Sequence, residues 1–117
     1  MAEPWKTDQW FTSPWTYAPE LTKNYNFQKN IQIHDVTLRD GEQQTGVVFR
    51  REEKVAIAKQ LDALHVQRIE AGMPAVSDQD KGAIIDIANL GLKNSKVFAF
   101  ARCIPAEIKV IEELKCQ

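Results

Sequence analysis

The chain has 117 residues, of which 44% are hydrophobic and 26% charged, a composition that indicates a folded globular protein and excludes a fibrous or disordered one. Its 15 Lys and Arg residues against 16 Asp and Glu residues give a net charge of -1, which favours neither nucleic acid nor an anionic membrane as a partner. Because no apolar stretch approaches the roughly 20 residues of a bilayer-spanning helix and no leader peptide is visible, we expect a cytoplasmic protein of one domain at most.

Residues 1–30 form a first region that follows no regular hydrophobic period. The region holds all three tryptophans, both tyrosines and three of the five prolines. Aromatic side chains gain much from burial, so this composition argues against plain disorder. We predict an irregular N-terminal arm that packs on its own domain or on a second subunit, with a ligand-binding aromatic patch as the alternative.

From residue 31 onward, short β-branched runs alternate with amphipathic helical stretches. The predicted elements, in chain order, are a strand at 31–37, a helix at 51–64, a strand at 66–72, a helix from Ser77 to Gly91, a strand at 96–101 and a helix from Pro105. This alternation is typical of a parallel sheet built from βα units.

Local signals support the helix boundaries. The first helix has an apolar stripe of Val55, Ala58, Leu61 and Leu64. Ser77 and Asp80 have the spacing of an N-terminal capping box, and Pro105 suits the first turn of a helix.

Three βα units fit either a doubly wound sheet or a (β/α)8 barrel, which needs about 250 residues. The doubly wound alternative is disfavoured because its phosphate-binding GxGxxG turn is absent from the sequence. In either fold three parallel strands would leave an open sheet edge. We therefore expect a fragment, or a subunit that another chain completes.

The densest polar cluster, HDVTLRDGEQQTG at 34–46, lies where the first predicted strand ends. Ligands of α/β folds gather at the carboxyl ends of strands. Arg39 suits a donor to a developing oxyanion, and Asp40 suits an oxygen ligand of a divalent metal. A surface salt bridge in a loop is the alternative interpretation.

Glu70 is an acidic residue in an otherwise buried type of strand, in the string RIEAGMP. A buried carboxylate needs a partner, and Arg39 is the natural candidate if both strands end at one mouth of the sheet. A structural ion pair elsewhere is the alternative. We expect His34 and His65 to have structural roles, and Cys103 and Cys116 to be free thiols.

The strings DVTLRDGEQ, EEK followed by IAKQLDAL, and RIEAGMPAVS together resemble the N-terminal part of the DRE-TIM metallolyases. This family includes isopropylmalate synthase, homocitrate synthase and hydroxymethylglutaryl-CoA lyase. The resemblance covers about residues 31–102. It implies an α/β fold in which residues 31–117 form the first three βα units of a partial TIM (β/α)8 barrel, behind the aromatic arm of residues 1–30.

The resemblance also implies roles for single residues. Arg39 matches the arginine that steadies the enolate oxygen, Asp40 the carboxylate that binds the metal, and Glu70 the acid that completes the signature triad. Gln43 matches a glutamine near the metal and the substrate. Arg102 is a candidate for binding the substrate carboxylate, with an ordinary helix-end cation as the alternative.

The family reaction is a metal-dependent Claisen-type condensation of acetyl-CoA with a 2-oxo acid, used in amino-acid biosynthesis, or the corresponding cleavage in the lyases. The resemblance implies Mg, Mn or Zn as cofactor. Family members complete the metal site with an H-x-H pair on a late strand, which this sequence lacks. We therefore expect the chain to be inactive alone, to bind metal weakly or not at all, and to assemble with itself or with a partner chain. A non-catalytic split subunit is the alternative.

Overall fold

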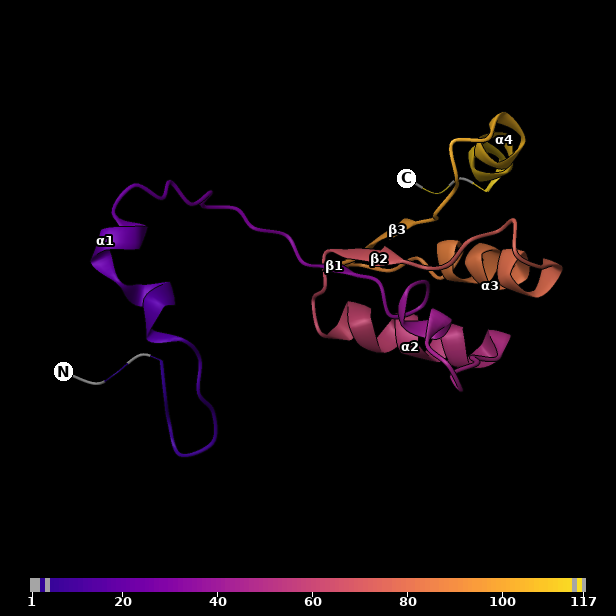
Figure 1. The fold of residues 1–117 in the computed structure, drawn as a ribbon. Helices are drawn as coiled ribbons and strands as arrows, with labels where there is room; N and C mark the ends of the chain where they lie inside the picture. Colours follow the sequence, from indigo (N-terminus) through magenta and orange to yellow (C-terminus); the bar gives the residue numbers. More distant parts are fainter. Residues whose placement is uncertain (1–2, 4, 115, 117) are drawn as a thin grey trace. The chain divides into compact units, whose positions relative to one another are not determined.

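The computed structural model describes residues 3, 5–114 and 116, and the chain divides into two compact units, residues 1–31 and 32–117 (Figure 1). The first unit contains two single-turn helices, η1 (Pro14–Tyr17) and α1 (Pro19–Thr22), each begun by a proline. Its rings form local pairs, such as Tyr25 and Phe27 with centroids 5.4 Å apart. Most of its large apolar side chains are exposed. The proposed packing of this arm on another surface stays a prediction.

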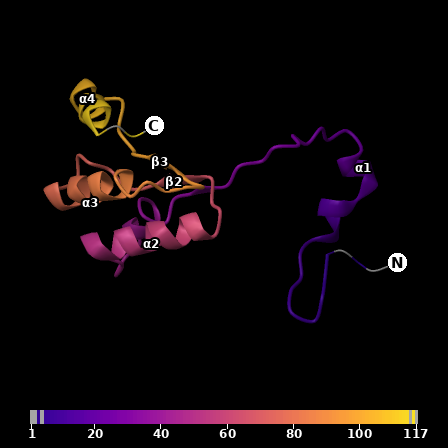
Figure 2. The same ribbon diagram turned by 180° about the vertical axis from the view of Figure 1, so that it is seen from behind.

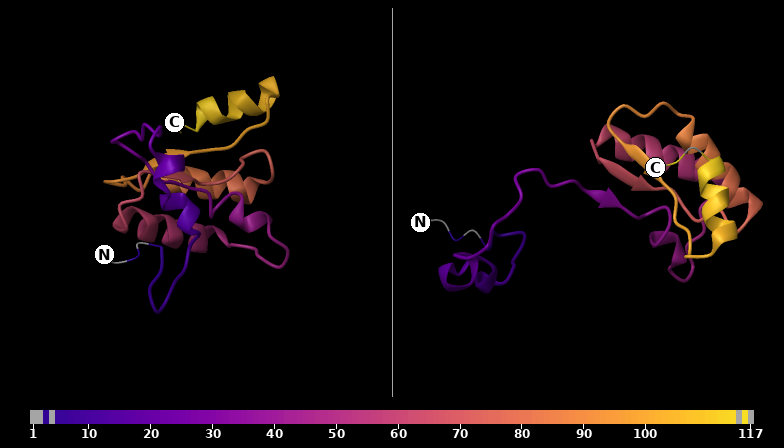
Figure 3. Two further views of the ribbon diagram at one scale, coloured as in Figure 1. Left: turned by 60° about the vertical axis from the view of Figure 1, so that its left-hand side comes forward. Right: turned by 90° about the horizontal axis from the view of Figure 1, so that it is seen from above.

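The second unit contains a parallel sheet in the order β1-β2-β3. Its strands are β1 (His34–Asp35), β2 (Arg68–Glu70) and β3 (Lys96–Phe98). Each strand is followed along the chain by a helix, as the colour sequence in Figures 2 and 3 shows. The predicted α/β organisation with parallel strands is confirmed.

The strands are shorter than the sequence predicted. The first was expected to continue to Thr37, but the Asp35 carboxylate accepts hydrogen bonds from the backbone N and Oγ1 of Thr37 at 3.0 and 3.1 Å, which turns the chain after Asp35. Beyond β2, pairing with the third strand continues only as single bonds, from Ala71 N to Phe98 O and from Phe100 N to Gly72 O. The side-chain hydrogen bonds of Asp35 therefore account for the early end of β1.

The helices begin where the sequence placed them. They are α2 (Arg51–Ala63), α3 (Asp78–Ala88) and α4 (Pro105–Glu113). Ser77 is the N-cap of α3, and its Oγ accepts a hydrogen bond from the backbone N of Asp80 at 3.0 Å, as predicted. The helix ends at Ala88, three residues before the predicted end at Gly91. In both Figure 1 and Figure 2, α2 and α3 lie side by side, and their residues are in contact.

The end of α2 explains the role of His65. Val66 N donates to Leu61 O and His65 N donates to Asp62 O, the two bonds of a Schellman motif. His65 occupies the left-handed position of this motif with a φ of 60°, where glycine is the usual residue. His65 is thus a structural residue, as expected.

The apolar core lies between the sheet and the helices. Its fully buried side chains are Leu38, Ala58, Ile69, Ala71, Ala83, Ile84 and Ile87. Because side chains alternate along a strand and Ile69 of β2 packs into this core, Arg68 and Glu70 point to the opposite face of the sheet. The second face therefore carries the charged residues of β2.

The structure tested the expectation for the cysteines. Both cysteines are free thiols, as predicted, with Cys103 exposed and Cys116 half-buried. Burial raises the pKa of the Cys116 thiol.

Among the described residues, no helix combines the length and apolar character needed to cross a membrane.

Candidate functional site

The turn after β1 carries three of the predicted site residues. The backbone N–H groups of Arg39, Asp40 and Gly41 all donate to the carbonyl of Val36, at 3.1, 2.8 and 3.1 Å. A short 3₁₀ helix, η2 (Gly41–Gln43), follows directly. This tight winding places the side chains of the RDGEQ string close to the carboxyl end of the sheet.

Arg39 and Glu70 form an ion pair between the turn after β1 and the end of β2. Arg39 Nε donates to Glu70 Oε1 at 2.6 Å, and the two side chains are 20% and 11% exposed. His34 Nε2 donates to the other carboxylate oxygen, Oε2, at 3.0 Å. The predicted pairing of Glu70 with Arg39 is confirmed. The contact of His34 with the same carboxylate was not predicted.

The Glu70 carboxylate is held in its ionised form. Burial acts to raise its pKa, but the hydrogen bonds from His34 and Arg39 and the charge of the guanidinium outweigh burial, so that the pKa lies below its ordinary value. The ionised carboxylate in turn fixes the guanidinium. The Arg39 Cζ also lies 4.8 Å from the centre of the Phe100 ring, which supports the guanidinium plane from β3's side.

Asp40 joins the same group of charges from the solvent side. Arg39 Nη1 donates to Asp40 Oδ1 at 2.7 Å, and the Asp40 side chain is 60% exposed. Arg39 thus bridges one buried and one exposed carboxylate. The structure therefore brings Arg39, Asp40 and Glu70 together, as the sequence predicted.

A cleft of about 300 Å³ opens beside this group. The residues that line it are Leu38, Arg39, Glu42, Gln43, Val47, Val48, Gly72, Met73, Val76 and Asp80. Arg39 and Gln43 are therefore the predicted site residues that face this cleft, together with an apolar wall.

Arg102 lies apart from this cluster. Its backbone N and Nε donate to the two carboxylate oxygens of Glu107 at 3.1 and 2.9 Å, and its Nη2 also contacts Glu107. Glu107 belongs to the first turn of α4. No hydrogen bond or ion pair between described residues joins Arg102 to Arg39, Asp40 or Glu70, so its environment matches the helix-end alternative.

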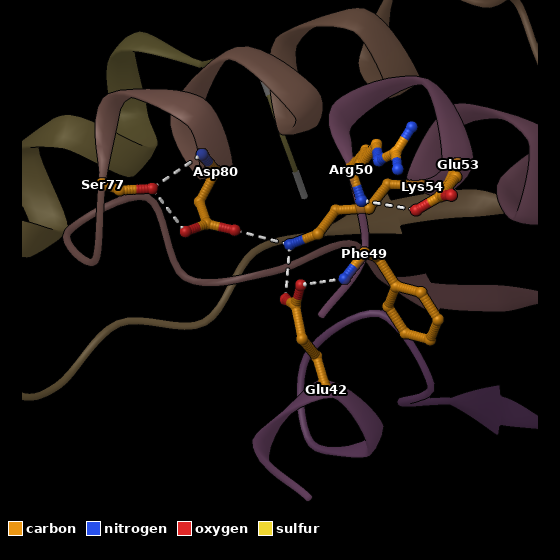
Figure 4. Close-up of polar contacts among 7 residues, drawn as sticks. All are labelled: Glu42, Phe49, Arg50, Glu53, Lys54, Ser77 and Asp80. Atoms are coloured by element: carbon orange, nitrogen blue, oxygen red, sulfur yellow. Dashed lines mark hydrogen bonds and ion pairs between the residues drawn. The ribbon is translucent and has the colours of Figure 1, made fainter. Parts of the chain in front are cut away.

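The sequence interpretation missed a second set of charges beside the cleft. The Lys54 side chain is only 2% exposed, and its Nζ lies 2.5 Å from both Glu42 Oε2 and Asp80 Oδ1 (Figure 4). A signal was present, because Lys54 shares the buried face of α2 with Ala58 and Leu61 at the spacing i, i+4 and i+7. A lysine on that face requires acidic partners.

The partners of Lys54 are themselves held in place. Glu42 Oε1 accepts from the backbone N of Phe49 at 3.0 Å, and Asp80 Oδ2 accepts from Ser77 Oγ at 2.6 Å (Figure 4). Burial acts to lower the pKa of Lys54, but its bonds and charge attraction to Asp80 and Glu42 raise the pKa overall. Burial acts to raise the pKa of Asp80, and the bonds from Lys54 and Ser77 overcome it, leaving a lowered pKa.

The described residues do not form a complete metal site. Within the part of the chain that the structure describes, no three His, Cys, Asp or Glu side chains are grouped so that they could hold a metal ion. Asp40 offers one exposed carboxylate, and one of its oxygens, Oδ1, already accepts a hydrogen bond from Arg39. One carboxylate is too few for a specific divalent site.

A parallel sheet with a helix after each strand is the architecture of a β/α domain, and charged residues lie here at the carboxyl ends of β1 and β2. Residues 30–116 match the HMGL-like family. The chain therefore belongs to the HMGL-like family, and the predicted relationship to the DRE-TIM enzymes is confirmed.

Several relatives are synthases. The chain is 51% identical over 79 residues to homocitrate synthase 1 of Nostoc sp., covering 68% of this chain and 21% of the relative. It is 44% identical over 94 residues to homocitrate synthase AksA of Methanothermobacter thermautotrophicus, covering 80% and 23%. It is 41% identical over 88 residues to 2-isopropylmalate synthase 2 of Caldanaerobacter subterraneus, covering 75% and 22%. The chain thus spans about a fifth of the length of these relatives.

Proposed function

We propose that this chain forms the first three βα units of a (β/α)8 enzyme that condenses acetyl-CoA with a 2-oxo acid in cytoplasmic amino-acid biosynthesis. The observation that carries the proposal is the arginine bridge: Arg39 links Glu70 and Asp40 at the carboxyl ends of β1 and β2. The names of the homocitrate and isopropylmalate synthases among its relatives support this reaction class.

Arg39 is the proposed donor to the enolate oxygen. A Claisen condensation builds negative charge on that oxygen, and a guanidinium held beforehand by fixed partners stabilises it without reorganisation. Glu70 restrains the guanidinium by accepting from it, and His34 in turn holds the Glu70 carboxylate. Gln43, which lines the cleft beside Arg39, is the proposed contact for the 2-oxo acid. Arg102 would reach the substrate carboxylate only if it left Glu107.

Asp40 is the proposed contribution of this chain to a divalent metal site for Mg, Mn or Zn. When bound, such a metal would supply Lewis-acid polarisation of the ketone. Because no three His, Cys, Asp or Glu side chains of the described residues are grouped as metal ligands, we propose that this chain alone binds metal weakly or not at all and has no activity alone. We propose that a second copy or a partner chain assembles with this chain.

A chimera tests the proposal. Residues 30–116 would replace the matching segment of the Nostoc homocitrate synthase 1, and release of CoA from acetyl-CoA would be measured with a panel of 2-oxo acids. We expect an active chimera in which Arg39→Ala lowers kcat by about 100-fold or more, in line with the loss of one oxyanion donor. A folded chimera whose activity does not depend on Arg39 would contradict the proposal.

Two other functions would give different outcomes. A carbon–carbon lyase is one alternative, and cleavage of hydroxymethylglutaryl-CoA by the chimera would support it. A non-catalytic subunit that assembles with a partner chain is the other alternative. A stable metal-free oligomer of the 117-residue chain, with no activity in the chimera, would support that role.

A further inference from the structure

The buried ammonium group of Lys54 has no place in the proposed chemistry. It comes from α2, and its two acidic partners come from two other elements, Glu42 from η2 and Asp80 from α3 (Figure 4). Burying a lysine is costly even when it is paired, and apolar packing at such a position is often as stable. The contact of Lys54 with two acidic groups therefore suggests that this lysine fixes the relative positions of the three elements.

Glu42 connects Lys54 to the loop that carries the site. It directly precedes Gln43 and follows Asp40 by two residues. One of its carboxylate oxygens binds Lys54, and the other accepts from the backbone N of Phe49, so this one side chain closes the loop between residues 42 and 49. The other hydrogen bonds of residues 42–48, within the described chain, are local turn bonds such as Val47 N to Gln44 O.

The loop closed by Glu42 is one wall of the cleft. Gln43, Val47 and Val48 line the cleft from this side, and Asp80 lines it from the start of α3. The Lys54 ammonium lies between the two walls, 2.5 Å from a carboxylate of each. Without this cation, Glu42 and Asp80 would repel each other across the same space.

We propose that Lys54 is a positioning residue: its ammonium group holds Glu42, and through Glu42 the loop that carries Gln43 and begins two residues after Asp40, at a set distance from α3. This inference rests on the proposed function, which assigns the cleft as the place where Gln43 meets the 2-oxo acid. Lys54 acts through Glu42 and does not touch the ligand.

The chain offers a matched control. Arg51 also joins α2 to α3, donating from Nε and Nη2 to Asp86 at 2.6 and 2.7 Å. Both side chains are exposed, by 49% and 40%, and no hydrogen bond or ion pair among the described residues joins either of them to Glu42. A lysine that merely joins the two helices should behave like Arg51, whereas a lysine that positions the loop should not.

Amide hydrogen exchange of the 117-residue chain separates these possibilities. In Lys54→Met we expect exchange in residues 43–50 to rise at least tenfold relative to the core amides of Ile69 and Ile84, and Lys54→Arg should restore part of the protection. Arg51→Met should leave the loop unchanged. Equal effects of the Lys54 and Arg51 variants would overturn the proposal.

Glu42→Gln keeps the proposal testable if Lys54→Met does not fold. This variant removes the charge by which Glu42 attracts Lys54 and leaves Lys54 paired with Asp80. The fold should therefore persist, while amide exchange in the loop rises severalfold. Unchanged exchange in this variant would also overturn the proposal.

A kinetic measurement then connects the loop to the ligand. In the chimera, Glu42→Gln should raise the KM for the 2-oxo acid at least fivefold and change the KM for acetyl-CoA less than twofold, whereas Arg51→Met should change neither. A KM that is unchanged despite a mobile loop would overturn the link to the ligand. A chimera without activity in any form would reject the proposed function, and the exchange data would still decide the role of Lys54.

Discussion

Two charged clusters flank the cleft, and they differ in how far their cation is accessible to solvent. In the strand-end cluster, formed by Arg39, Asp40, Glu70 and His34, a guanidinium is held by a buried carboxylate and still reaches an exposed one. In the loop-anchoring cluster, formed by Lys54, Glu42 and Asp80, the cation is buried and bound by acidic groups from two elements. The first arrangement leaves a cation near solvent for chemistry, and the second uses its cation to hold backbone in place.

The largest expected effect on stability comes from the loop-anchoring cluster. Lys54→Met leaves two carboxylates facing each other, and we expect a loss of about 2 to 4 kcal/mol in the free energy of unfolding, less than for a fully enclosed pair because both acids keep some exposure. Urea unfolding measures this change. Arg51→Met, which removes an exposed pair, should cost less than about 1 kcal/mol. A Lys54 variant as stable as the native chain would remove the contrast between the two clusters.

Within the strand-end cluster, the buried and the exposed carboxylate should differ. Glu70→Gln removes the charge that accepts from Arg39 and His34, and we expect it to destabilise the chain by about 1 to 3 kcal/mol. Asp40→Asn removes an exposed partner and should cost less than about 1 kcal/mol. Thermal unfolding of both variants tests this order, and the reverse order would show that Asp40, not Glu70, anchors the guanidinium.

Acid should weaken both clusters. The pKa values of Glu70 and Asp80 are lowered in the folded chain, so each carboxylate contributes stability that is present above its unfolded pKa, about 4, and is lost as the pH falls through its folded pKa. Urea unfolding at a series of pH values should show stability falling below about pH 4. In Lys54→Met the fall should be shallower, since Asp80 then loses the cation that lowers its pKa. An unchanged pH dependence of the unfolding free energy in Lys54→Met would contradict the effect of Lys54 on the pKa of Asp80.

The smallest expected effect lies outside both clusters, at the end of α2. His65→Gly relieves the left-handed backbone and should change the free energy of unfolding by no more than about 1 kcal/mol, in the stabilising direction. His65→Val, which places a β-branched residue at the same φ, should destabilise the chain. Neither variant should alter amide exchange in residues 43–50. If exchange there did change, it would follow the global stability of the chain and not the contact of Lys54 with Glu42.

The sequence predicted those features of the fold that depend on neighbouring residues. The helix starts at Arg51 and Pro105 and the cap at Ser77 follow from short-range signals and were right. Strand lengths were wrong because they depend on pairing partners and on the turn that Asp35 makes. The contact between Arg39 and Glu70 was predicted because the carboxyl ends of neighbouring parallel strands meet, although their roles in catalysis stay predictions.

The amino-acid sequence by itself determined the alternation of strands and helices, the family and the charged string after β1, because hydrophobic period, caps and motifs are local properties. Only the tertiary structure decided that His34 shares the carboxylate of Glu70, that Arg102 turns to Glu107, and that Lys54 is buried between Glu42 and Asp80. These contacts join residues from separate elements, and which acidic group meets which cation depends on how the helices and the sheet pack.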